Sequence, residues 1–161
     1  MRLFIGSFAK LDSYESLKQE FSALKLTWVK EENLHLTYAF FPDEQDAKLL
    51  LEGLKELPLE HKALEIKGMS TFGEKILYAK VDDETVHKNY KLIHEKFSGE
   101  IKRFDPHVTL ARIKTQESTL IQQALSQVKS KHLGTLCLEI LLIQSTLTPQ
   151  GSIYKVLSSL K

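Results

Sequence analysis

Two copies of the tripeptide His-x-Thr, His35-Leu36-Thr37 and His107-Val108-Thr109, are the residues in this sequence best suited to do chemistry. Two imidazoles directed at one phosphate form a complete acid–base pair, because one removes a proton from the attacking oxygen while the other protonates the leaving oxygen. The ordinary pKa of histidine, about 6.5, allows one ring to be neutral and the other charged at working pH. The threonine hydroxyls can donate hydrogen bonds to the non-bridging phosphate oxygens.

Each tripeptide lies in an apolar segment with the composition of a β-strand, at residues 34–41 and 107–113. Strict alternation along a strand places the histidine, the threonine and the following alanine, Ala39 or Ala111, on one face. The two motifs are about half a chain length apart, which indicates a duplication. If the halves are related by a pseudo-two-fold axis, their polar faces meet across a cleft.

The patterns along the rest of the chain mix strands with helices, and so predict an α+β fold built twice. We expect further strands at residues 2–8, 26–30, 62–72, 75–81, 136–146 and 152–158. We expect helices from about Asp12 and at residues 43–57, 84–97 and 116–129. No linker rich in Pro, Gly or Ser separates the halves, and we therefore expect residues 1–161 to form a single bilobal domain.

Composition narrows the class of protein. The net charge of +1 argues against a protein that wraps long nucleic acids by bulk electrostatics, and is compatible with a local basic site for the end of a nucleic-acid strand.

The single Cys137 cannot form an internal disulfide, and we expect it to be buried. Residues 1–6 are too short an apolar run for a signal peptide, and no run reaches the ~18 residues of a membrane span. We expect a cytoplasmic protein and, without an apolar interface stripe, a monomer.

The remaining four histidines lack a partner threonine. His87 and His94 are seven residues apart on a predicted helix, which is not the i, i+4 pair that binds zinc on a helix. The sequence has no Cys pair and no carboxylate–histidine cluster with metal-ligand spacing. We therefore expect neither a metal nor a cofactor.

The sequence resembles the two-histidine (2H) phosphoesterases, and within them the RNA 2′,3′-cyclic phosphodiesterases of bacteria and archaea, also called 2′-5′ RNA ligases. Four segments carry the resemblance: residues 2–5, 28–37, 106–112, and 145–151 with Tyr154 just beyond. The two His-x-Thr motifs are its specific part. The resemblance implies two pseudo-symmetric lobes of antiparallel sheet plus helices around a central cleft.

The activity implied by the resemblance is metal-independent hydrolysis of an RNA 2′,3′-cyclic phosphate end to a 2′-phosphomonoester. Carried over by motif, His35 would donate a proton to the departing 3′ oxygen. His107 would accept the proton of the attacking water, and Thr37 and Thr109 would bind the phosphate. The sequence itself is symmetric with respect to donor and acceptor, so that assignment comes from the family alone.

Three further residues are candidate substrate contacts: Arg112, Tyr154 and Phe4. Strict alternation puts Arg112 on the face opposite His107, so it needs a β-bulge or a strand end to reach the cleft. Aromatic side chains can stack a terminal base, although most of them are needed in the core. The aromatic residues considered for stacking are Phe4, Phe8, Phe40 and Tyr154.

Other functions use the same residues. Microscopic reversibility allows the site to join RNA ends through a 2′-5′ bond without ATP. The substrate could instead be a small cyclic nucleotide, such as a cyclic phosphate derived from ADP-ribose, or a 2′-5′ linked oligoadenylate. A non-catalytic module that binds RNA ends is a third alternative, but a pure binder has no need of two matched acid–base groups. The expected partners are RNA ends or small nucleotides that carry a 2′,3′-cyclic phosphate.

Overall fold

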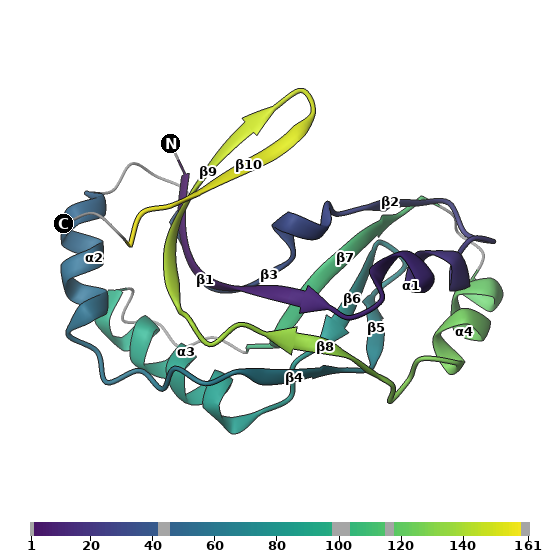
Figure 1. Cartoon of the computed structure of the whole chain (residues 1–161), viewed down its shortest axis with the longest axis horizontal. Coiled ribbons are helices and arrows are strands. Elements are labelled where there is room, and N and C mark those ends of the chain that lie inside the picture. The colour runs from purple at the N-terminus through teal and green to yellow at the C-terminus, as the bar shows by residue number, and fades with distance from the viewer. Residues whose placement is uncertain (1, 42–45, 98–103, 115–117, 159–161) are drawn as a thin grey trace.

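The computed structural model describes residues 2–41, 46–97, 104–114 and 118–158, and within these ranges strands and helices follow each other as an α+β fold (Figure 1). This confirms the predicted fold class. The strands are β1 (Arg2–Leu11), β2 (Leu26–Trp28), β3 (His35–Phe41), β4 (Leu64–Lys67), β5 (Met69–Phe72), β6 (Ile76–Lys80), β7 (His107–Ile113), β8 (His132–Leu136), β9 (Leu141–Thr148) and β10 (Gly151–Val156). The helices are α1 (Tyr14–Glu20), the 3-10 helix η1 (Glu31–Asn33), α2 (Ala47–Lys55), α3 (Glu84–Phe97) and α4 (Ser118–Ser126).

The two motif strands, β3 and β7, are neighbours in the middle of one antiparallel sheet. The strand order is β10-β9-β1-β3-β7-β6-β5, with β2 beside β7, and with β4 and β8 attached to the far end of β1. In Figure 1 the β9–β10 hairpin stands out from one end of the sheet, while α1 and α4 gather at the other end. The chain thus brings motifs from its two halves side by side.

One face of the motif strands is packed and the other is open. Leu36 and Val108, the middle residues of the two motifs, are fully buried, whereas the motif histidines and threonines are partly exposed. Helix α3 packs against β3 and contributes Val86, Tyr90 and Ile93 to the core. Because this apolar face is buried, the polar side chains must lie on the opposite side of the sheet. We call that side the open face.

Two predicted strands are each divided in the structure. The segment 62–72 breaks at Gly68, which has a φ of +79° and approaches the Lys129 carbonyl so closely that a Cβ would lie 2.4 Å from its oxygen. The segment 136–146 becomes the end of β8 and most of β9, because these two strands pair with different parts of β1. Cys137 lies in the connection between them and is partly exposed, so the expectation of a buried thiol is wrong.

The predicted helices 43–57 and 116–129 are shorter in the structure. Helix α2 begins after Asp46, whose carboxylate accepts hydrogen bonds from the backbone N–H groups of Lys48 and Leu49. This is the N-cap geometry that satisfies the first amides of a helix. Residues 43–45 and 116–117 lie outside the described residues. Among the helices of the described ranges, none combines the length and the apolar character that a membrane crossing requires.

Candidate active site

The two His-x-Thr motifs are directly apposed in the β3–β7 pair. Their middle residues, Leu36 and Val108, are Cα partners in antiparallel register. This register places each motif histidine opposite the threonine of the other motif, around a local two-fold axis. The two histidines then occupy diagonal positions, whose Cβ atoms are typically about 7–8 Å apart or somewhat less. Two imidazoles and two hydroxyls therefore surround one small space on the open face.

Both imidazoles are held by the same kind of hydrogen bond, to the backbone carbonyl two residues earlier in the chain. Nδ1 of His35 lies 2.7 Å from the carbonyl oxygen of Asn33, and Nδ1 of His107 lies 2.7 Å from the carbonyl oxygen of Asp105. A carbonyl oxygen can only accept, so Nδ1 carries the hydrogen in each ring. The opposite nitrogen, Nε2, is left to exchange protons with a ligand. In each case the hydrogen bond also fixes the ring orientation.

Two aromatic rings support the imidazole of His35. The ring centroids of Phe4 and Tyr154 lie 4.8 Å and 5.1 Å from that of His35, and the two aromatic rings meet edge to face at 5.2 Å. Phe4 is only 3% exposed, so it lies beneath the imidazole and is covered by its neighbours. Tyr154, on β10, is at intermediate exposure and is the member of the pair that a ligand can reach. Burial raises the pKa of the Tyr154 hydroxyl, which also has a side-chain hydrogen bond with Ser152.

A second aromatic pair, which is not among the residues predicted from the sequence, supports His107 in the same way. Phe72 and Tyr78 lie 4.9 Å and 5.5 Å from His107 between ring centroids, and they stack on each other at 4.1 Å. They come from the hairpin of β5 and β6, next to β7. The available signal was weak, because Phe72 and Tyr78 lie in two different predicted strands, 62–72 and 75–81, and only the β6–β7 pairing brings them to the histidine.

The environments of the two imidazoles differ. Burial of the His35 ring lowers its pKa, the Asn33 carbonyl opposes this, and the charge of His107 lowers the pKa further. This last effect follows from the apposition of the two motifs, because a nearby positive charge disfavours the charged form of an imidazole. Thr37 and Thr109 accept and donate no side-chain hydrogen bond within the described part of the chain, so both hydroxyls are available to a ligand.

A β-bulge follows the motif in β3. Ala39 pairs with Ile5 and Thr37 with Gly6, which leaves Tyr38 as the extra residue. A bulge inverts the alternation beyond it. Ala39 is consequently buried, and Phe40 is turned outward at 50% exposure. The prediction that Ala39 shares the face of His35 is wrong for this reason.

A matching bulge follows the motif in β7. Ala111 pairs with Leu77 and Thr109 with Tyr78, so that Leu110 is the extra residue. Ala111 is fully buried, contrary to strict alternation, and Arg112 is exposed. The bulge is the irregularity that Arg112 needs in order to share a face with His107. Arg112 and Phe40 are thus equivalent positions in the two halves.

Each bulge leaves a backbone carbonyl that another element satisfies. Nε2 of His94, on α3, lies 2.7 Å from the Tyr38 carbonyl oxygen. The Leu110 carbonyl accepts from the Val29 N–H at 2.8 Å and from the Tyr14 hydroxyl at 3.3 Å. These contacts fix both bulges, because an unpaired buried carbonyl would be costly.

The side chain of Tyr38 is buried as well. Burial raises the pKa of the Tyr38 hydroxyl to about 12, and the hydrogen bond between this hydroxyl and Asn89 opposes the rise.

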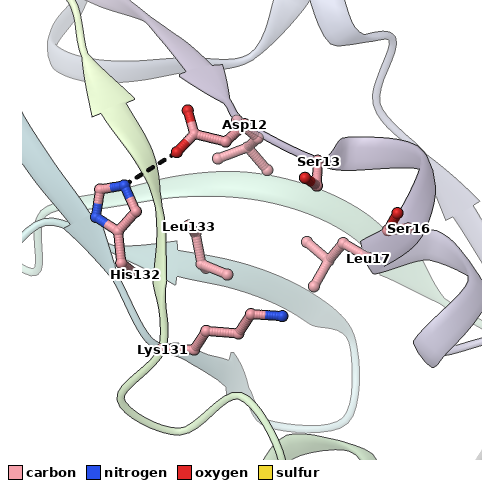
Figure 2. A pocket seen from close by; sticks show the side chains of 8 residues that line it. Asp12, Ser13, Ser16, Leu17, Lys131, His132 and Leu133 are labelled. Carbon is pink, nitrogen blue, oxygen red and sulfur yellow. Dashed lines mark hydrogen bonds and ion pairs between the residues drawn. The ribbon is translucent and has the colours of Figure 1, made fainter.

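A small pocket elsewhere is distinct from the motif residues. It lies between the end of β1, the start of α1 and β8, and Figure 2 shows His132 pointing toward Asp12 there. Its volume is about 80 Å³, below the ~300 Å³ typical of small-molecule sites. Among the described residues, no three or more His, Cys, Asp or Glu side chains form a group that could hold a metal ion.

Comparisons with known proteins show which proteins this chain is similar to. A family model described as the 2′-5′ RNA ligase superfamily matches residues 10–146. Proteins named RNA 2′,3′-cyclic phosphodiesterase are similar over nearly the whole chain. That of Thermotoga maritima is 30% identical and the alignment covers 98% of this chain and 93% of the relative. That of Methanocaldococcus jannaschii is 25% identical, and the alignment covers 98% of both chains.

Solved structures show the same fold. The protein TT0787 of Thermus thermophilus superposes with a TM-score of 0.69 at 24% identity, and the match covers 98% of this chain and 95% of that one. E. coli LigT complexed with 3′-AMP superposes with a TM-score of 0.73 at 16% identity, over 97% of this chain and 94% of that one.

Proposed function

Because the chain belongs to the 2′-5′ RNA ligase superfamily, we propose that it hydrolyses RNA 2′,3′-cyclic phosphate ends to 2′-phosphomonoesters without a metal ion. One observation carries the proposal. The two motifs are apposed in antiparallel register, with Nδ1 of each histidine on a carbonyl and Nε2 available. A phosphate between them has a proton donor and a proton acceptor on opposite sides, as in-line displacement at phosphorus requires.

In the proposed reaction His107 accepts a proton from water as the water oxygen attacks the phosphorus. The bond from phosphorus to the 3′ oxygen breaks, and His35 donates its proton to that oxygen. The phosphate remains on the 2′ oxygen. Thr37 and Thr109 hold the non-bridging oxygens, and placement of the phosphate between fixed groups lowers the entropic part of the barrier. The two histidines carry out both proton transfers, so the proposed reaction needs no metal-bound water.

Arg112 and Tyr154 are the proposed substrate contacts beyond the motifs. Arg112 is exposed on the open face of β7, and its planar guanidinium suits two oxygens of one phosphate. The ring of Tyr154 borders His35 and offers an edge to the ribose or base. Phe4, the third candidate, is covered, and we propose that it supports the imidazole of His35 instead.

The test is hydrolysis of a short RNA that ends in a 2′,3′-cyclic phosphate, in EDTA, with the product resolved as 2′- or 3′-phosphate. We expect a 2′-phosphate product. His35→Ala and His107→Ala should each fold and lose about 10²–10⁴-fold in kcat. His61→Ala, at an exposed position outside the site, is the matched control. Activity that needs an added metal ion, or full activity in either motif variant, would overturn the proposal.

Two other outcomes point to the alternatives. Turnover of cyclic mononucleotides or 2′-5′ oligoadenylates, but not of RNA ends, would assign the site to small nucleotides. Tight binding of RNA ends without turnover between pH 5 and 8 would assign a binding role.

We also propose that the same site joins RNA ends. A 5′-hydroxyl in the position of water would attack the cyclic phosphate with the same two proton transfers and form a 2′-5′ bond. No ATP is consumed, because the strained cyclic ester is itself the activated group. Incubation of concentrated 5′-hydroxyl and cyclic-phosphate RNA fragments, followed by a search for a linkage that resists 3′-5′-specific nucleases, tests this. Absence of joined product under conditions that support hydrolysis would contradict it.

A further inference from the structure

The open face continues from His35 onto the β9–β10 hairpin. Arg2, Ser145 and Tyr154 form one row across β1, β9 and β10, because Ser145 is the Cα partner of both of the others. Tyr154 contacts Phe4, and Phe4 contacts His35. Since Arg2 and Phe4 are two residues apart on one strand, their side chains share a face. Arg2 therefore lies on the same face as the proposed catalytic centre, about 7 Å further along β1 than Phe4.

A depression of about 430 Å³ lies at this row. Its lining is polar apart from one leucine and has no carboxylate; it consists of Arg2, Gln144, Ser145, Thr146, Leu147 and Ser152. Arg2 is exposed and has no ion pair within the described ranges. The volume is within the range of sites for small ligands. An unneutralised guanidinium beside serine hydroxyls is suited to the oxygens of a phosphate.

Asn33 fixes this hairpin relative to His35. Its carbonyl accepts the Nδ1 hydrogen bond of His35 at 2.7 Å, and its side-chain amide donates to the Ser152 carbonyl at 2.9 Å. One residue therefore anchors both the imidazole and the strand that carries the depression. The position of Arg2 relative to the reacting phosphate is set by the sheet and by this bridge.

We infer that the depression at Arg2 is a subsite for the RNA chain, in which Arg2 binds the phosphodiester that joins the terminal nucleotide to the one before it. The inference rests on the proposed function. When the 3′ oxygen leaves toward His35, the terminal ribose lies on the His35 side and water enters on the His107 side. The remainder of the RNA is attached to that ribose, so it extends past Tyr154 toward the hairpin. A cyclic mononucleotide has no such phosphodiester and does not reach Arg2.

The experiment compares Arg2→Ala with wild type on two substrates: a cyclic 2′,3′-mononucleotide and an oligonucleotide that ends in a 2′,3′-cyclic phosphate. We expect kcat/KM for the oligonucleotide to fall about 10- to 100-fold, the usual range for one charge-assisted hydrogen bond, and kcat/KM for the mononucleotide to stay unchanged. The slope of log kcat/KM against log salt should weaken by about 0.7 for the oligonucleotide only. Lys155→Ala is the matched control, since Lys155 is on the same hairpin but alternates to the opposite face.

Two results would overturn the inference: an equal loss on both substrates, or no loss on the oligonucleotide. If wild type hydrolyses neither substrate, the proposed function fails and the subsite is tested by binding instead. Fluorescence anisotropy with an oligonucleotide that ends in a 2′-phosphate then compares Arg2→Ala with Lys155→Ala. A loss of affinity confined to Arg2→Ala supports the subsite, and equal affinities of Arg2→Ala and Lys155→Ala contradict it.

Discussion

At the scale of single residues, the two motif histidines have the same hydrogen bonding and differ in burial. Both donate Nδ1–H to the carbonyl two residues earlier and both pack against an aromatic pair. Burial lowers the pKa of His35, so the ligand-free protein favours its neutral form. A proton donor at this position must therefore gain its proton when an anionic substrate binds, because the phosphate charge raises the imidazole pKa. Substrate binding and protonation of His35 are then linked.

This linkage predicts the titration of His35. By NMR of the ring carbons, the pKa of His35 in the free protein should lie below its ordinary value of about 6.5, and saturation with a 2′-phosphomononucleotide should raise it. His107→Gln should also raise the His35 pKa, because it removes a nearby positive charge. The kcat/KM for a cyclic mononucleotide reports the free enzyme, so it should decline as pH rises through the lowered His35 pKa, since less His35 is then protonated. A His35 pKa above the ordinary value in the free protein, or one unmoved by ligand, would contradict this account.

A second residue prediction concerns Arg112. Arg112→Ala should lower kcat/KM for a cyclic mononucleotide about 10- to 100-fold, because a charge-assisted contact to the phosphate is lost. Arg112→Lys should recover only part of the activity, since an ammonium cannot bind two oxygens in a planar fork. Lys114→Ala, a neighbouring exposed cation, is the control. Equal activity of wild type and Arg112→Ala would remove Arg112 from the site.

At the scale of elements, the bulges after each motif account for most of what sequence reasoning missed at the site. The motif residues, their strands and their shared face follow from alternation over three residues. Alternation fails at Tyr38 and Leu110, because a bulge depends on which strand pairs beside it and on which group satisfies its carbonyl. Those partners, His94 and Val29, both lie far away in the sequence from the residues that they contact. Strict alternation therefore places Phe40 on the wrong face.

The bulge in β3 also predicts a requirement for glycine in β1. A Cβ on Gly6 would lie 2.4 Å from the carbonyl oxygen of Leu36, between the motif residues of β3. Gly6→Ala should therefore push β3 away, destabilise the protein by about 1–3 kcal/mol and lower kcat about 10²-fold through misplacement of the motif. Thermal unfolding and kinetics on the folded fraction measure the two effects.

Gly134→Ala is the matched control for this variant. A Cβ there would lie 2.0 Å from the Lys10 carbonyl oxygen, on the part of β1 that pairs with β8. It should destabilise the protein without changing kcat of the folded fraction. If both glycine variants keep full kcat, the close approach at Gly6 has no role in aligning the motif.

At the scale of the whole molecule, the sheet order could not be predicted from this sequence. The ten residues of β1 pair with three strands, β3, β8 and β9, which come from both halves of the chain. Patterns reveal that a segment is a strand, but not its partners. The break within 136–146 shows this, because β8 and β9 separate only where β1 exchanges one partner for the other. The same non-local pairing brings Tyr154 to His35 and Tyr78 to His107.

Outside the site, at the far end of β1, His132 on β8 forms hydrogen bonds with two carboxylates from other parts of the chain. Its Nδ1 lies 2.7 Å from a carboxylate oxygen of Glu65, on β4. Its Nε2 lies 3.0 Å from a carboxylate oxygen of Asp12, just after β1, and Figure 2 shows this second contact. Hydrogen bonds to the Glu65 and Asp12 carboxylates raise the pKa of His132. Both ring nitrogens can donate only in the protonated form, so the bridge is complete only when His132 is charged.

This bridge predicts a pH dependence of stability with a definite sign. Because the folded-state pKa is raised, the folded state binds the proton more tightly than the unfolded chain, and the stabilisation is present below about pH 6.5 and is lost as pH rises through the folded-state pKa. The melting temperature of His132→Gln should therefore fall below that of wild type at about pH 5.5 and approach it at about pH 9. His61→Gln, which removes an exposed histidine elsewhere, is the control. A difference between wild type and His132→Gln that stays constant across this pH range would mean that the ring contributes through packing rather than through its charge.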